Sequence, residues 1–100
     1  MKKSLLRIDK YIKELNPKYV YVIANNQMLT KAYIKYISDS LGINKNKLIV
    51  ITDKVSKSIE INDSIAILCA HWYKNPLVKK YNLLDAFNYC ITIPIDEIER

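Results

Sequence analysis

Two patterns of hydrophobic residues alternate along the chain, and each predicts a different element. Through residues 3–15 the apolar residues recur at steps of three and four, with charged residues between them. This spacing predicts an amphipathic helix, which the Asn16-Pro17 pair ends. Residues 19–24 are instead an unbroken β-branched and aromatic run, which is typical of a strand buried on both faces.

The next segment returns to the helical period and then to an unbroken run. Asn26 is suited to the N-cap of the predicted helix, and Gly42 to the left-handed position that follows its last turn. Residues 48–52 are a second unbroken apolar run. The strand, helix and strand together predict a right-handed β-α-β unit.

The elements in the second half of the chain are predicted less clearly than those in the first half. Residues 53–63 fit neither period, so a one-turn helical crossover and a short edge strand both stay open. Asn75 and Pro76 are suited to the N-cap and first position of a helix. After residue 63 we expect a buried strand at residues 64–70 and a helix at 75–88. A fourth strand at 89–93, which Pro94 ends, and a last helical turn at 95–98 complete the chain.

This order of elements predicts a fold class. A helix followed by β-α-β-β-α-β over residues 19–94 indicates one α/β domain over residues 1–100, in three layers and Rossmann-like (flavodoxin-like). Its sheet is expected to be four-stranded and mainly parallel, with strand order 2-1-3-4 by analogy with doubly wound sheets. A chain of 100 residues buries a modest share of its surface on folding, so a homodimer is among the expected states.

The amino-acid composition excludes several classes of protein. Gly42 is the one glycine, and both the P-loop and the dinucleotide fingerprint need several. One histidine and two cysteines do not make a usual zinc ligand set, so we expect neither a metal nor a bound cofactor. Cys69 and Cys90 lie in apolar runs and are predicted to be buried free thiols.

The charge pattern bears on location and partners. Apolar runs are far too short for a membrane span, and Arg7 and Asp9 interrupt any signal-peptide core. We therefore expect a soluble cytoplasmic protein with no membrane partner. The net charge of +6 is concentrated in residues 1–58, but only Arg7 and Arg100 among the sixteen cations are arginine. Nucleic acid is therefore a partner that the sequence permits but does not favour.

Three polar clusters follow the predicted strands. In an open parallel sheet, ligands bind outside the carboxyl ends of the strands, near the point where strand order reverses. The clusters expected there are Asn25-Asn26-Gln27, Thr52-Asp53-Lys54 and His71-Trp72-Tyr73-Lys74. We expect the clusters to lie side by side, with ligand contacts from Asn25, Asn26, Gln27, Asp53, His71, Trp72 and Tyr73.

Each cluster has a structural explanation beside a functional one. Residues 25–27 precede a helix, so they suit an anion at its N-terminus or simply cap it. Asp53 stands where an acidic residue would contact a ribose, or it serves a turn. The rings of residues 71–73 suit stacking on a nucleobase, or they cover the end of the sheet or an oligomer interface.

Two short stretches carry a resemblance. Val-Ile-Ala-Asn-Asn at residues 22–26 and Trp-Tyr-Lys-Asn-Pro at residues 72–76 resemble small single-domain Rossmann-like proteins encoded by bacteriophages. The resemblance covers about residues 19–94. It implies this fold and a viral or mobile-element accessory protein in the host cytoplasm, and it brings no catalytic residue with it.

Three functions are compatible with these features. The first is an accessory binding protein that engages a nucleotide-like small molecule or a host protein at the carboxyl end of its sheet. The second is a nucleotide-processing enzyme, a hydrolase or glycosyl transferase, with His71 or Asp53 as general acid or base. The third is a nucleic-acid-binding protein that uses the basic residues 1–58.

Overall fold

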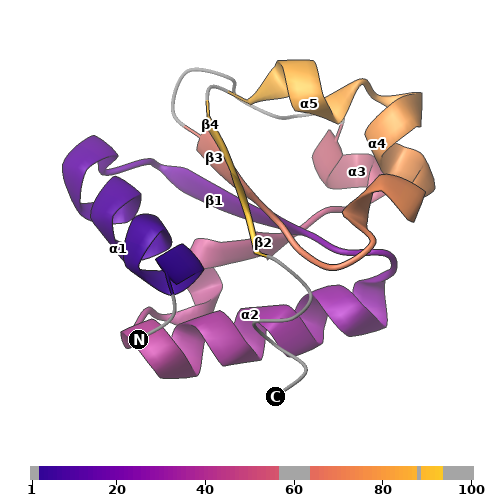
Figure 1. The fold of residues 1–100 in the computed structure, drawn as a ribbon. Coiled ribbons are helices and arrows are strands. Elements are labelled where there is room, and N and C mark those ends of the chain that lie inside the picture. Colours follow the sequence, from indigo (N-terminus) through magenta and orange to yellow (C-terminus); the bar gives the residue numbers. More distant parts are fainter. Residues whose placement is uncertain (1–2, 57–63, 88, 94–100) are drawn as a thin grey trace.

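The computed structural model describes residues 3–56, 64–87 and 89–93 (Figure 1). The helices and strands in chain order are α1 (Lys3–Leu15), β1 (Tyr19–Ile23), α2 (Gln27–Leu41), η1 (Lys45–Lys47), β2 (Leu48–Val50), α3 (Asp53–Ser56), β3 (Ser64–Leu68), η3 (Trp72–Lys74), α4 (Pro76–Lys80), α5 (Leu83–Ala86) and β4 (Tyr89–Thr92).

The four strands form one all-parallel sheet in the order β2-β1-β3-β4. The predicted strand order is therefore confirmed, and the fold is of the flavodoxin or Rossmann-like α/β type. β1 and β3 occupy the centre, with Val22 opposite Ile67, while β2 and β4 form the two edges. The order of strands reverses between β1 and β3, so the carboxyl ends of these two strands flank the switch point where such folds bind ligands.

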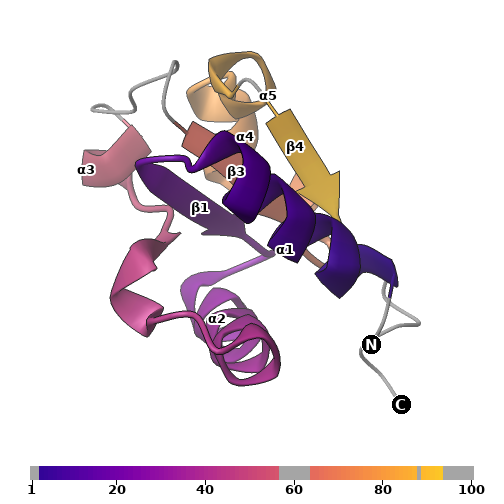
Figure 2. The same ribbon diagram turned by 90° about the vertical axis from the view of Figure 1, so that its left-hand side faces the viewer.

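Helices cover both faces of the sheet (Figures 1 and 2). Val20 and Val22 point toward α1 and α2 and join the core on that side. Tyr21 and Ile23 alternate with them and pack on the other side with residues of α3, α4 and α5. This double burial is the reason that the central strands read as unbroken apolar runs rather than as alternating ones.

The edge strand β4 departs from the prediction. Cys90 was expected to be a buried thiol, but it is exposed, as are Tyr89 and Thr92, and only Ile91 is buried within the strand. Cys90 lies opposite Ala66 in the register. Among the described residues, the core on the Ala66 face includes no residue of β4. The apolar run of β4 therefore does not imply burial on both faces.

The helix predicted for residues 75–88 is also corrected. Asn75 caps α4 through its side chain and Pro76 follows at the first position, as expected, but the helix ends at Lys80. Asn82 adopts a left-handed conformation with φ of 49° and separates α4 from α5. The break shifts the apolar face, so that Leu83 is buried and Leu84 is exposed.

The predicted ends of α2 are confirmed, whereas β2 and β3 each end two residues before the strands predicted at residues 48–52 and 64–70. Asn26 Oδ1 accepts a hydrogen bond from Leu29 N at 2.8 Å and caps α2, and Gly42 ends that helix with φ of 67°. α3 supplies one helical turn at the start of segment 53–63, and the predicted turn at 95–98 lies outside the described residues. Among the described helices, none is long and apolar enough to cross a membrane.

The two thiols are expected to differ sharply in reactivity. Burial raises the pKa of the Cys69 thiol far above its ordinary value, whereas Cys90 is accessible and partial burial raises its pKa less. A thiol reagent should therefore modify Cys90 in the native protein and Cys69 only after denaturation. Mass spectrometry with Cys90→Ser as the control distinguishes the two sites, and rapid native modification of that variant would contradict the buried position of Cys69.

Candidate functional site

The loop from β1 to α2 is held by a buried threonine. Thr30, which is 2% exposed, donates its hydroxyl to the carbonyl of Asn26 at 2.7 Å and accepts from the backbone N–H of Ala24 at 3.2 Å. Asn26 uses its side chain to cap α2, while Asn25 is half-buried and Gln27 exposed. The turn is thus fixed by its own hydrogen bonds, and capping accounts for the position of Asn26.

A buried asparagine joins this loop to the next one along the sheet. Asn75 Nδ2 donates to the carbonyl oxygen of Ala24 at 2.9 Å, and its Oδ1 accepts from Leu77 N at 3.1 Å. Asn75 is 7% exposed. The sequence identified Asn75 only as a cap, because its second hydrogen bond reaches across 51 positions of the chain. One side chain therefore caps α4 and ties the end of β1 to the segment that follows β3.

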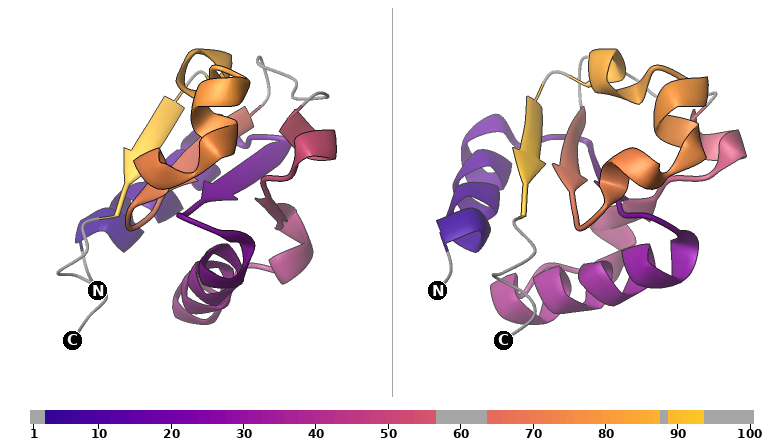
Figure 3. Two further views of the ribbon diagram at one scale, coloured as in Figure 1. Left: turned by 90° about the vertical axis from the view of Figure 1, so that its right-hand side faces the viewer. Right: turned by 45° about the vertical axis from the view of Figure 1, so that its right-hand side comes forward.

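A shallow hollow lies where β3 and β4 end. Figure 3 shows these strands side by side, with η3 and α4 beginning beyond the end of β3. The hollow has a volume of about 210 Å³ and is open to solvent. Its lining comes from the residues after β3 and from the end of β4: Cys69, Ala70, His71, Trp72, Tyr73, Thr92 and Ile93.

The three predicted rings meet at this hollow. His71 takes a left-handed conformation with φ of 55°, which is uncommon for residues other than glycine and turns the chain into η3. The Tyr73 ring stands edge-on to both neighbours, with centroids 6.1 Å from His71 and 5.7 Å from Trp72. His71 Nδ1 and the Tyr73 hydroxyl are 3.3 Å apart. Trp72 packs partly on the core, whereas Tyr73 is 61% exposed.

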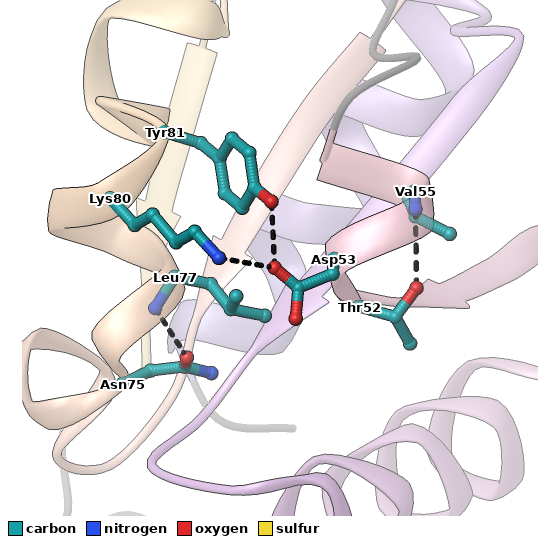
Figure 4. A network of polar contacts seen from close by, with 7 residues as sticks. All are labelled: Thr52, Asp53, Val55, Asn75, Leu77, Lys80 and Tyr81. Atoms are coloured by element: carbon teal, nitrogen blue, oxygen red, sulfur yellow. Dashed lines mark hydrogen bonds and ion pairs between the residues drawn. The ribbon is translucent and has the colours of Figure 1, made fainter.

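Asp53 belongs to a different group of side chains. Its Oδ1 accepts from Lys80 Nζ at 3.0 Å and from the Tyr81 hydroxyl at 2.6 Å (Figure 4). Asp53 follows β2, and β1 separates β2 from β3 in the sheet, so this contact connects the β2 end to α4. The structure does not pair Asp53 with His71, whose side-chain hydrogen-bond partner is Tyr73.

The Asp53 contact changes the chemistry of its partners. The hydrogen bond and negative charge of Asp53 raise the pKa of Tyr81 above its ordinary value, and they raise that of Lys80 as well. Both groups therefore keep their protons to a higher pH than usual, and Tyr81 acts as the hydrogen-bond donor to Asp53. Asp53 and Lys80 are exposed, and the Tyr81 ring is half-buried against the core. We therefore expect the ion pair to position α4 rather than to contribute much stability.

Taken together, these features define an all-parallel α/β domain with an aromatic hollow at the carboxyl edge of its sheet. Within the described part of the chain, no three His, Cys, Asp or Glu side chains are grouped as a metal site would require. No protein-family model, no curated protein and no solved structure matches the chain. The residues that line the hollow therefore carry the information on its function.

Replacing Asn75 tests the connection between the two loops. Asn75→Ala leaves the buried Ala24 carbonyl without its donor and removes the cap of α4, so we expect a loss of about 2 kcal/mol or more. Urea unfolding followed by circular dichroism measures it. Asn44→Ala is the matched control, because Asn44 caps η1 in an exposed position and should cost about 1 kcal/mol or less. Equal losses in the two variants would contradict the connecting role.

The raised pKa of Tyr81 can be measured directly. In the native protein Tyr81 should titrate above the ordinary tyrosine pKa of about 10, and Asp53→Asn should lower that pKa by removing the negative charge. The stability that depends on the neutral phenol is present below pH 10 and is lost as the pH rises through the raised value. NMR of ¹³Cζ-labelled tyrosine follows the titration. Asp85→Asn, whose carboxylate instead contacts Asn82, should leave Tyr81 unchanged.

Proposed function

We propose that this is a non-catalytic binding protein that takes a nucleobase-like planar ring in the hollow at the carboxyl end of β3. The observation that carries the proposal is the convergence of His71, Trp72 and Tyr73 around one hollow. Aromatic faces bind bases by stacking, at about 1–3 kcal/mol per base. The imidazole and the phenol add polar groups able to hydrogen-bond the edge of such a ring.

The volume of the hollow limits the size of the ligand that it can hold. Pockets for drug-sized molecules usually occupy about 300–1,000 Å³, and this hollow is smaller, at about 210 Å³. A single base or nucleoside suits that volume better than a dinucleotide does. The buried side chains of Cys69 and Ile93 contribute apolar surface to the lining, which favours an uncharged ring.

Binding is favoured over catalysis because the two candidate acid/base groups have separate partners. His71 contacts Tyr73, and Asp53 contacts Lys80 and Tyr81. Asp53 and His71 are thus not brought together as the acid and base of one catalytic site. The resemblance of residues 22–26 and 72–76 to small phage proteins supports an accessory role for a virus or mobile element, in the host cytoplasm.

The experiment uses the single tryptophan as its own reporter. Trp72 fluorescence is titrated with adenosine, guanosine, cytidine, uridine and their monophosphates, and at least one of them should quench it saturably. Tyr73→Ala should weaken that binding by about tenfold or more, since it removes one exposed stacking face. Tyr89→Ala is the control, because Tyr89 is also an exposed tyrosine but lies at the start of β4 and not in the hollow.

Two results would contradict the proposal. One is the absence of saturable quenching by every compound up to millimolar concentration. The other is equal binding by the wild type and Tyr73→Ala, which would place the ligand elsewhere on the protein. Turnover of a bound nucleotide would favour the enzyme hypothesis instead, with His71→Ala as the variant expected to abolish it.

A further inference from the structure

The first turn of α1 lies at the rim of the aromatic hollow. The Ser4 hydroxyl donates to the carbonyl of Thr92 at 3.4 Å, and Thr92 is one of the residues that line the hollow. On the buried side, Leu5 belongs to the same core cluster as Cys69 and Ile93, which also line the hollow. Figures 2 and 3 show the start of α1 near the end of β4. The residues at the start of α1 are therefore neighbours of any ligand that the hollow holds.

α1 lies alongside β4 and runs in the opposite direction. Ser4 contacts Thr92 at the end of the strand, and the Tyr11 ring stacks on Tyr89 at its beginning, with centroids 5.9 Å apart. Arg7 is three residues after Ser4 and four before Tyr11, and residues at these spacings are neighbours on one side of a helix. Arg7 therefore lies on the side of α1 next to β4, one helical turn from the rim of the hollow.

This part of α1 carries two cations that no carboxylate neutralises. Lys3 and Arg7 are exposed, and within the described part of the chain neither side chain has an ion pair or a hydrogen bond. Further along the helix, by contrast, Lys13 pairs with Asp9 at 2.9 Å. None of the described residues that line the hollow is acidic. The rim next to α1 thus presents positive charge that an anionic group of a ligand can meet.

We propose that the ring ligand of the hollow is a nucleoside monophosphate whose phosphate is bound by Arg7 and Lys3. This inference rests on the proposed function, because it takes the base to occupy the hollow. A volume of about 210 Å³ suits one base or nucleoside, so the phosphate lies outside it, at the rim. The planar guanidinium of Arg7 can bond two phosphate oxygens at once, and the Lys3 amine adds a second positive charge.

The first test compares each nucleoside with its 5′-monophosphate. Trp72 fluorescence measures both dissociation constants in low-salt buffer. The monophosphate should bind about tenfold more tightly or better, because contacts from charged donors to the phosphate are added. This preference should shrink as salt is raised, since exposed charges are screened.

The second test assigns the preference to particular side chains. Arg7→Gln should weaken monophosphate binding by about fivefold or more and leave nucleoside binding unchanged. Lys10→Gln is the matched control, because it removes the same charge from an exposed site on the same helix. Lys10 adjoins Tyr11 and so lies toward the other end of β4; its loss should change monophosphate binding by about twofold or less. Circular dichroism checks that both variants fold.

Two results would overturn the inference and leave the proposed function standing. One is equal affinity of the wild type for a nucleoside and its monophosphate, and the other is a preference for the monophosphate that Arg7→Gln does not reduce. Monophosphate binding that Arg7→Gln weakens and Tyr73→Ala does not would support the phosphate contact and contradict the ring contact. The absence of binding by every compound would contradict both.

Discussion

The pairing of β1 with β3 is the constraint on which the rest of the structure depends. Both strands are buried on both faces, and their register extends beyond the strands themselves through the bond from Cys69 N to the carbonyl of Ile23. Asn75 then bonds the carbonyl of Ala24, the first residue after β1. Because these buried groups must find partners inside the protein, the loops that leave the two central strands are held in a fixed relation to each other.

That fixed relation produces the aromatic hollow. The chain leaves β3 through a left-handed His71, passes through η3 and reaches the Asn75 cap, so three consecutive rings are compressed into a short turn. An extended segment would have sent alternate side chains in opposite directions. Here the turn brings His71, Trp72 and Tyr73 to one opening beside the end of β4. The proposed ring-binding role depends on this turn more than on any single side chain.

The two edges of the sheet have different surroundings. β2 follows Lys47, and the segment after its carboxyl end is tied to α4 by the Asp53 contacts with Lys80 and Tyr81. Three of the four residues of β4 are exposed and none is charged. α1 lies against this strand, with the Tyr11 ring stacked on Tyr89 and the Ser4 hydroxyl bonded to the Thr92 carbonyl. The hollow lies beside the end of β4, at the edge that α1 packs against.

Local sequence determined the elements of the fold. Unbroken apolar runs marked the two central strands, and Asn26 and Gly42 marked the ends of α2. The alternation of strands and helices indicated the parallel sheet, and analogy with doubly wound sheets supplied its order. The polar clusters at strand ends could be identified for the same reason, since parallel strands all end at one edge. Tertiary structure alone decided that Cys90 is exposed, that Leu83 rather than Leu84 is buried, and which partners Asn75 and Asp53 find. These outcomes depend on which helix covers which strand and on contacts between residues far apart in the chain, and neither leaves a periodic signal in the sequence.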